Sequence, residues 1–463
     1  MSSDLIAALD VGKTHTRLSI IDPQAGTEIW NARSTTHSLD TSLGRQLPVA
    51  TIEQWLIEAL KNAPNRDRIA AVVPIAHGAA AILLDDRGQI LAAPDYEEAN
   101  FERVKEAYEA ERDPFERTFS PSLPLGLNLG RQLFYFEKKE PQVFSRVAHV
   151  LLYPQYWAWR LSGVMACEVT SLGCHSDLWL PQVREFSRLA RRRGWFHLFP
   201  SQRFAGETLG LARGPTAEVA GLAPNCRIVC GIHDSNASYL RYLLSRRGNP
   251  FAVISSGTWT VVMANQSRLD RLQADRDMLA NVDAFGSPVP TARFMGGREY
   301  EAIARTHEPP TFNALKSVID RGAMARPAFA LGGPFAHSKG QLLHAQTLCA
   351  LERAALATLY VALMSDVLLE SLGMAGDIIV DGPLASNSLF AAVLARLRSP
   401  SRVLAEGGRC ALTAICSLSG YPQEREPPVD AVQPIKLDRL QEYQSAWSKQ
   451  LPGANLALRS HTN

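Results

Sequence analysis

The chain has 463 residues, of which 46% are hydrophobic and 20% are charged, as in ordinary globular proteins of two or three domains. The formal net charge is +2 at pH 7, so electrostatics favours neither nucleic acid nor an anionic membrane as a partner. Seven cysteines are an odd number in a chain large enough to bury a core without crosslinks, so a disulfide framework is not expected.

The first elements predicted along the chain form a β-hairpin, with apolar strands at 5–9 and 17–21 around a polar turn. The N-terminus lacks a basic region, so no signal peptide is predicted, and we judge that no apolar stretch is long enough to cross a bilayer. A cytoplasmic protein is therefore expected. The next predicted elements are a helix near 52–62, a strand at 68–75, a hairpin over 80–92, helices at 131–138 and 154–161, and a strand at 227–230.

Two clusters in this half have alternative interpretations. The basic run 184–193 is interpreted as a solvated helix face, with nucleic-acid binding as the less favoured alternative. Cys226, Cys230 and His233 carry metal-ligating atoms, but no second cysteine pair stands at zinc-finger spacing. Structural thiols are therefore the favoured interpretation of these two cysteines.

A breaker cluster at 246–250 divides the chain. After it, a strand at 251–254, a Ser/Gly/Thr turn and a strand at 260–263 repeat the layout of residues 5–21. The repeat predicts two related halves, each opening with a turn that fits phosphate. The expected domains are an N-terminal one over 1–246, a C-terminal one over 250–435, and a final helix and tail over 436–463.

Further elements of the second half follow from its apolar runs and breakers. They are a long helix at 352–372, a buried strand at 377–380, a helix after Asn387, a strand, glycine loop and helix over 401–415, a proline-rich stretch at 422–431, and an amphipathic helix near 437–450.

The run Gly12-Lys13-Thr14 resembles part of a P-loop, but that motif is rejected. It requires a glycine where this chain has Ala7, and it requires a helix where 17–21 is predicted as a strand. The turn can still hold phosphate, since Gly12, Lys13 and Thr14 supply backbone donors, a positive charge and a hydroxyl.

Two more residues belong to this first turn. Thr16 adds a hydroxyl donor, and Asp10, at the end of the first strand, can orient a Mg²⁺ ion, usually through water. Any Asp-Gly hairpin shares some of these features, so the turn alone is a weak signal.

The second turn has donors of the same kind. Ser256, Gly257 and Thr258 are expected to hold phosphate, with an ordinary β-turn as the alternative. Upstream, Asp234 follows a β-like run; it can cap a helix that begins at Ser235, serve as a base, or do both. A base near a phosphate-binding turn suggests phosphoryl transfer to a hydroxyl group.

His77 and Gly78 follow the strand at 68–75 in an exposed loop and are candidates for substrate binding, although a lone histidine is more often structural. A Ser–His–Asp hydrolase is not predicted, because the chain has no G-x-S-x-G elbow.

These motifs together resemble the FGGY carbohydrate kinases of the sugar kinase, actin and heat-shock chaperone superfamily. Segments 231–238 (GIHDSNAS) and 294–301 (FMGGREYE) are similar to the L-fuculose and L-rhamnulose kinase-like branch. The likeness spans most of the chain, through the first phosphate motif at 10–17, a sugar-loop hairpin at 75–88, the catalytic-aspartate stretch at 231–238, the second phosphate motif at 255–258 and the adenosine motif at 381–387.

The resemblance implies an α/β fold of two actin-like, ribonuclease H-like domains with a cleft between them. Sugar would lie mainly against the first domain and ATP mainly against the second. In this assignment Asp234 is the catalytic base, Asp10 orients Mg²⁺, the nucleotide contacts beyond the two turns are Gly382, Pro383 and Asn387, and the substrate-binding residues are His77, Gly78, Asp95, His233, Asp234 and Arg298.

The predicted function is that of an ATP-dependent kinase that transfers the γ-phosphate to a hydroxyl of a small sugar, favouring a ketose such as L-fuculose, L-rhamnulose or a xylulose-like sugar. ATP and Mg²⁺ are the expected cofactors, neither nucleic acid nor membrane is an expected partner, and a homodimer is one assembly considered. The alternative is a chaperone-like ATPase or a sugar-sensing pseudokinase. The carboxylate at 234 argues against it, because a protein without kinase activity needs no base there.

Overall fold

The computed structural model describes residues 4–246, 248–406, 410–421 and 431–452. The glycine loop predicted within 401–415 and nearly all of the proline-rich stretch at 422–431 lie outside the described residues, as does the side chain of Cys410.

Contacts divide the chain into two compact units. The first comprises Met1–Ser245, Ala280–Pro288 and Arg409–Glu426, and the second comprises Arg246–Leu279, Val289–Gly408 and Pro427–Asn463. The first passage between units falls at the predicted breaker cluster. Two later segments return to the first unit, and the predicted contiguous domains over 1–246 and 250–435 do not include that return.

The main sheet of the first unit has the strand order β12-β13-β6-β1-β2-β3. β1 (Leu5–Val11) pairs antiparallel with β2 (His15–Asp22) and parallel with β6 (Ile69–Ala76), and β6 pairs parallel with β13 (Arg227–Val229). The predicted hairpin is longer than expected, because Val11 still pairs with Thr16 and leaves a tight turn.

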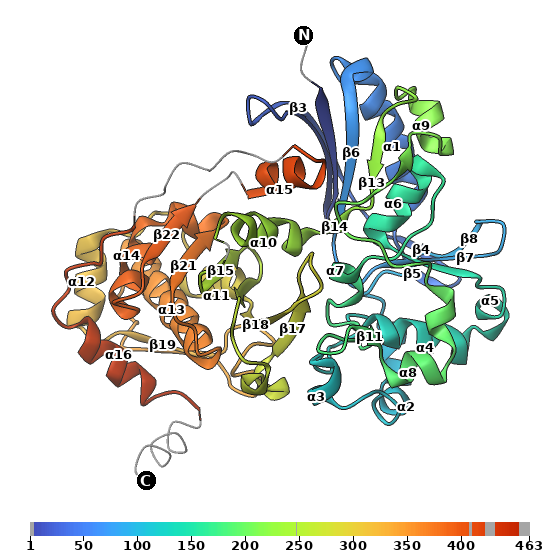
Figure 1. Ribbon diagram of the computed structural model, residues 1–463. Coiled ribbons are helices and arrows are strands. Elements are labelled where there is room, and N and C mark those ends of the chain that lie inside the picture. Colours follow the sequence, from blue (N-terminus) through green and yellow to red (C-terminus); the bar gives the residue numbers. More distant parts are fainter. Residues whose placement is uncertain (1–3, 247, 407–409, 422–430, 453–463) are drawn as a thin grey trace. The chain divides into compact units, whose positions relative to one another are not determined.

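Alternation along the strands gives this sheet two apolar faces. Leu5, Ala7 and Leu9 pack with α1 (Val49–Asn62), α6 (Tyr153–Ser162) and α9 (Pro215–Ala220), which lie together on one side in Figure 1. Ile6 and Ala8 pack with α10 (Asp234–Ser245) and α15 (Cys410–Leu418). The sheet is therefore covered on both faces, as α/β layers require.

A smaller three-stranded sheet, β8-β7-β9, packs with α4 (Leu129–Lys139) in a separate apolar cluster of the first unit. The other elements of the first unit are β3 (Thr27–Thr35), β4 (Leu39–Thr41), β5 (Gly44–Gln46), β7 (Ala81–Leu84), β8 (Ile90–Ala92), α2 (Lys105–Glu109), α3 (Phe115–Thr118), α5 (Pro141–Phe144), β9 (His149–Leu152), α7 (Val169–Leu172), β10 (Trp179–Leu180), β11 (Glu185–Phe186), α8 (Arg188–Arg192), β12 (Thr208–Leu211) and β14 (Ile232–His233).

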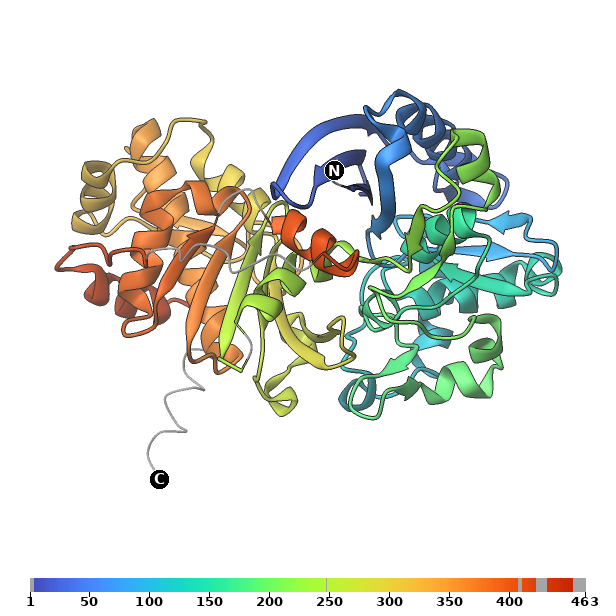
Figure 2. The same ribbon diagram turned by 45° about the horizontal axis from the view of Figure 1, so that its top comes forward.

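Five consecutive strands of the second unit's sheet follow the order β3-β2-β1-β6-β13 of the first, which confirms the repeated layout. β15 (Phe251–Ser256) pairs antiparallel with β16 (Thr260–Ala264) and parallel with β21 (Asp377–Asp381), as β1 pairs with β2 and β6. Figure 2 shows the yellow-green and orange strands of this sheet side by side. Its remaining strands are β17 (Met278–Val282), β18 (Pro288–Phe294) and β22 (Val403–Glu406), and a separate hairpin is formed by β19 (Met324–Arg326) and β20 (Gln341–Leu343).

The longest helix of the second unit corrects one expectation from the sequence. α13 (Ala350–Ser371) is long and apolar enough to cross a membrane by length and composition, although no such stretch was expected. In the structure, 78% of its most apolar window is buried inside the protein, so core packing accounts for its composition. It packs with α11 (Gly296–Ala304), α12 (Phe312–Asp320) and α14 (Ser388–Leu397), and the last described helix is α16 (Leu440–Ser448).

The structure bears on the basic run 184–193 and on the cysteine pair Cys226 and Cys230, which both had alternative interpretations. Much of the run 184–193 lies in α8, and its exposed Arg192 pairs with Glu111, which fits a solvated helix face. Cys226 and Cys230 are both buried, which fits the structural thiols expected at these two positions.

Candidate active site

The candidate base, Asp234, begins α10 directly after β14. β14 pairs parallel with β6 and sets His233 opposite Ala76, so Asp234 and His77 follow neighbouring strand ends. Gly231 makes this approach feasible, because its φ is +90° and a side chain there would collide with the carbonyl of Pro74.

The contacts of Asp234 converge on one carboxylate oxygen. Oδ1 accepts hydrogen bonds from the backbone N of Ser235 at 2.5 Å and from its hydroxyl at 3.2 Å. Nε2 of His233 lies 3.1 Å from the same oxygen. The side chain is 39% exposed, so a substrate hydroxyl can reach the carboxylate.

Asp10 is the second-last residue of β1, where it pairs with Ile75 of β6, and its side chain is exposed. Loss of water around the carboxylate and the negative charge of Asp234 raise the pKa of Asp10 to about 6, while the positive charge of Arg17 lowers it. Such a concentration of negative charge attracts a cation. Three or more metal-ligating side chains do not gather anywhere among the described residues, and a single carboxylate with waters and phosphate oxygens is a donor set that suits Mg²⁺.

Two residues of the first turn differ from the prediction. Thr16 is only 1% exposed and its hydroxyl pairs with that of Thr36 at 3.0 Å, so it is buried in the protein and we withdraw it as a phosphate ligand. The ammonium of Lys13 binds Asp95 and lies 3.5 Å from Glu97 and 4.8 Å from the centre of the Tyr96 ring. Gly12 and Thr14 keep an accessible position in the turn.

Asp95 also differs from the prediction. Its side chain is fully buried, and it accepts hydrogen bonds from Lys13, from Ser38 and from the backbone of Glu97, as well as an ion pair from Arg45 at 2.9 Å. Burial favours the neutral acid, but these donors hold the pKa of Asp95 below its usual value. Since its oxygens are occupied, Asp95 orders Lys13 and Arg45 rather than offering a free acceptor to a sugar.

The two candidate histidines lie close to the base. His77 is buried, and its ring packs edge-on to those of Tyr96 and Tyr153. Burial lowers the pKa of His77, so the neutral imidazole is favoured. His233 is 5% exposed, and Gly78 packs so closely against it that a Cβ at position 78 would lie 2.8 Å from Nε2. The structure thus brings His77, Gly78, His233, Asp234 and Asp10 to one edge of the first unit's sheet.

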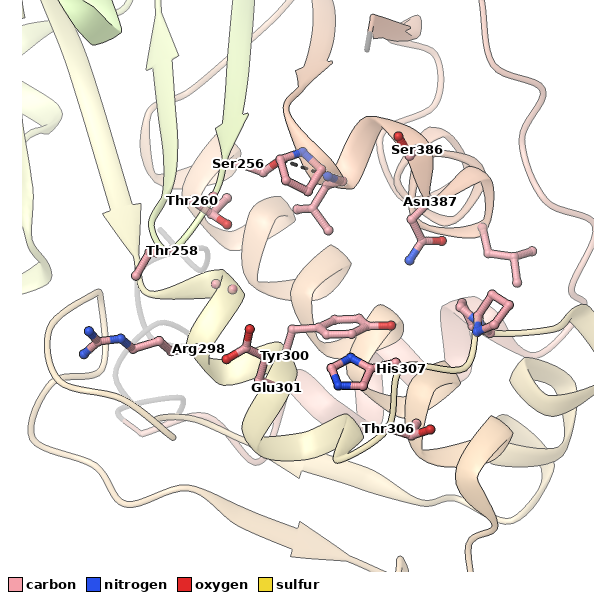
Figure 3. A pocket seen from close by; sticks show the side chains of 18 of the residues that line it. Ser256, Thr258, Thr260, Arg298, Tyr300, Glu301, Thr306, His307, Ser386 and Asn387 are labelled. Atoms are coloured by element: carbon pink, nitrogen blue, oxygen red, sulfur yellow. Dashed lines mark hydrogen bonds between the residues drawn. The ribbon is translucent and has the colours of Figure 1, made fainter. Parts of the chain in front are cut away.

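The second unit holds a pocket of about 1000 Å³ beside its own turn (Figure 3). Of the predicted nucleotide contacts, Ser256, Gly257, Thr258, Pro383 and Asn387 line it. Gly382 does not line the pocket but packs against the backbone of Ser256. Its φ is +79°, and a Cβ there would collide with the carbonyl of Ser256. The hydroxyl of Ser256 donates to the carbonyl of Asp381 at 2.6 Å and accepts from Leu384 N at 3.0 Å, which joins the turn to that wall.

The start of α11 forms a part of the pocket that sequence reasoning missed. Gly296 and Gly297 leave no room for side chains, because a Cβ on either would collide with Thr260 or with Gly257. Helix N-termini present free backbone N–H groups and favour anions, so this end of α11 suits phosphate. The segment 294–301 was noticed for its family likeness, and that was the available signal.

Arg298, predicted to approach the sugar, lies in the second unit and lines this pocket. In Figure 3 its guanidinium points away from Tyr300 and His307. Tyr300, Glu301 and His307 were not predicted, and they also line this pocket.

Comparison with known proteins agrees with this arrangement. The family described as "Carbohydrate kinase FGGY, C-terminal domain" matches residues 248–425. The chain is 33% identical to a carbohydrate kinase from Novosphingobium aromaticivorans, whose crystal structure superposes with a TM-score of 0.89 over 97% of this chain and 99% of that one. The chain belongs to the FGGY carbohydrate kinases.

Other members of the family are more distant. An L-fuculokinase from Haemophilus influenzae is 30% identical over 139 residues, which are 29% of this chain and 28% of that relative's length. A xylulose kinase from Lactobacillus acidophilus shares the fold, with a TM-score of 0.78 at 14% identity over 99% of both chains. The predicted α/β fold of two actin-like domains is confirmed.

Membership also bears on the predicted function. FGGY carbohydrate kinases are phosphotransferases with a sugar hydroxyl as acceptor, and they use ATP. The prediction of a carbohydrate kinase is confirmed at this level.

Proposed function

We propose that this FGGY kinase transfers the γ-phosphate of ATP to a hydroxyl of a small ketose, with Asp234 as the base. The observation that carries the proposal is the grouping of Asp234, Asp10, His77 and His233 at one edge of the first unit's sheet. A carboxylate that accepts the hydroxyl proton late in the reaction is sufficient for this chemistry.

In the proposed reaction the sugar oxygen forms a bond to the γ-phosphorus, and the bond from that phosphorus to the β-phosphate oxygen breaks to release ADP. The proton of the sugar hydroxyl passes to Asp234. His77 and Gly78 bound the sugar, and Gly12 and Thr14 contribute to the phosphates. Mg²⁺, when bound, neutralises phosphate charge, and Asp10 would hold it through water.

The pocket of the second unit suits the nucleotide. Ser256, Gly257 and Thr258 would contact phosphate oxygens together with the N-terminus of α11, while Asn387 and Pro383 would approach the adenosine. We reassign Arg298 to this nucleotide side. We also propose the division into domains over 1–246, 250–435 and 436–463, a cytoplasmic location and a homodimer.

A ketose is favoured as the acceptor because the relatives include an L-fuculokinase and xylulose kinases. The test is release of ADP from ATP and Mg²⁺ over a panel that contains L-fuculose, L-rhamnulose, D-xylulose, L-xylulose and glycerol, with a reaction lacking sugar as the control. We expect one ketose to raise ADP release at least about 100-fold over that control. Tight ATP binding without stimulation by any sugar would contradict the proposal.

A further inference from the structure

The two oxygens of Asp234 have different surroundings. All three of its contacts, from Ser235 N, Ser235 Oγ and His233 Nε2, reach Oδ1. No other residue in the described parts of the chain donates a hydrogen bond to Oδ2. One oxygen is therefore fixed by the protein while the other faces the exposed side of the carboxylate.

The protonation of His233 can be worked out from its neighbours. Nδ1 lies 3.3 Å from the side-chain amide of Asn236. If the amide presents its NH₂ group, Nδ1 is unprotonated and the ring proton is on Nε2. If it presents its oxygen, which has no other partner, Nδ1 is protonated. Nε2 then keeps a proton as well, because a bare nitrogen 3.1 Å from a carboxylate oxygen would be repelled by it.

We infer that His233 is a positioning residue that holds Oδ1 of Asp234 through the ion-pair contact from Nε2 and leaves Oδ2 as the oxygen that takes the substrate proton. The inference rests on the proposed function and adds to it the particular oxygen and the group that orients it.

The surroundings of His233 hold the ring in place. Its backbone N donates to Thr170 Oγ1 at 3.0 Å, and that hydroxyl donates to Glu168, which is buried. Cys174 Sγ lies 3.8 Å from Nε2 on the side of Gly78. Burial favours the neutral imidazole, but Cys174 and Asp234 raise the pKa of His233, which favours a proton on Nε2.

The titratable groups around the pair come from several elements. Asp234 faces Asp10 at the end of β1, His77 after β6 and Tyr96 after β8, and His233 faces Cys174 and Glu168. Because Asp10 titrates with a pKa of about 6, a pH profile would not report on His233 alone. The test therefore compares kcat and KM in two variants that keep Asp10 unchanged.

The test compares His233→Gln with His233→Asn. The amide nitrogen of glutamine extends about as far as Nε2 and can still contact Oδ1, whereas that of asparagine reaches only the position of Nδ1. We expect His233→Asn to lower kcat on the order of 10- to 100-fold with little change in KM. His233→Gln should recover most of kcat.

Equal losses of kcat in both variants would overturn the inference, since packing rather than the contact with Asp234 would then be at work. A second measurement does not need activity: the pKa of His233, followed by the pH titration of its imidazole resonances, should fall in Asp234→Asn, because the carboxylate 3.1 Å away raises it. An unchanged pKa of His233 in that variant would overturn the inference, and this readout is independent of whether any sugar stimulates the wild type, which tests the proposed function.

Discussion

The turns between β1 and β2 and between β15 and β16 occupy the same place in two sheets that share the order of five strands, yet their chemistry differs. One pair before the last pair of each hairpin, the first unit has Asp10 and the second has Ser255. Beyond the neighbouring parallel strand, the first unit has His77 and the second has Gly382. A common frame therefore presents acid–base groups in one unit and small donors in the other.

The walls around the two turns differ in the same sense. Lys13 in the first turn is held by Asp95 and Glu97, so its charge is balanced within the protein. The second turn faces a pocket that is lined by Gly296 and Gly297 at the start of α11, and the N–H of Gly297 donates to the carbonyl of Thr258 in that turn at 3.3 Å. The comparison shows that the turn residues and their neighbours, rather than the sheet topology, set what each unit can bind.

The largest effect is expected from a change of Asp234, the proposed catalytic base of the first unit. Asp234→Asn should lower kcat by about 10²- to 10⁴-fold, because the amide cannot take the proton, with little change in melting temperature. Steady-state ADP release and thermal unfolding measure the two effects. Asp86→Asn, at an exposed position between β7 and β8, is the matched control, and retained turnover in Asp234→Asn would remove it from its role.

The next largest effect is expected on stability. Asp95→Asn leaves Lys13 and Arg45 without their buried partner and should lower the free energy of unfolding by about 3 kcal/mol. Because the pKa of Asp95 is lowered on folding, its stabilisation is present above about pH 4 and is lost as the pH falls through the folded value. Urea unfolding at pH 7 and near pH 3 should therefore show a gap between variant and wild type that narrows in acid.

A second variant sharpens this result. Adding Lys13→Met to Asp95→Asn removes one of the stranded charges and should recover part of the lost stability. Additive losses would mean that the Lys13–Asp95 pair contributes little.

On the side of the second unit, Gly297→Ala places a methyl group against the carbonyl of Gly257. The turn and the start of α11 must then separate, so we expect affinity for ATP to fall about 10-fold, or about 1.4 kcal/mol. Equilibrium binding of a fluorescent ATP analogue measures it. Gly210→Ala is the control, because a Cβ there meets only ordinary contacts from 3.6 Å, and equal affinities in the two variants would contradict the assignment.

The smallest effect concerns Asp10 and has the opposite sign. Its folded pKa of about 6 lies above the ordinary value, so the folded state binds more protons and loses stability as the pH rises from about 4 to 6. Asp10→Asn lacks this loss and should melt slightly higher than the wild type at pH 8 but not at pH 4, while Mg²⁺-dependent turnover falls. A lower melting temperature at pH 8 would show that Asp10 is not charged against its surroundings.

Much of the fold could be predicted because its signals are local. A short window of apolar and polar residues is enough to predict each of these elements: the two hairpins, β6, the long α13 and the helix that follows Asn387. Strand ends extended beyond the prediction where pairing continued into polar residues, as at Asp10 and Thr16, because backbone hydrogen bonds do not require apolar side chains.

The site was predicted less evenly. Asp234, His233, His77 and the turn at 256–258 were found from residue type and place after a strand, and these are properties of short segments. Thr16 was misassigned because a hairpin turn does not reveal which face a side chain takes, and here it meets Thr36.

The sequence by itself determined the strands and their order along the chain, the two polar turns and the carboxylate at the start of α10. Each of these features depends on neighbours within a few residues. Only the tertiary structure decided that Asp95 is saturated by Lys13, Ser38 and Arg45, that α11 closes on the second turn, and that Cys174 and Thr170 hold His233. These partners lie far apart along the chain, and packing, not local preference, brings their atoms within hydrogen-bonding distance.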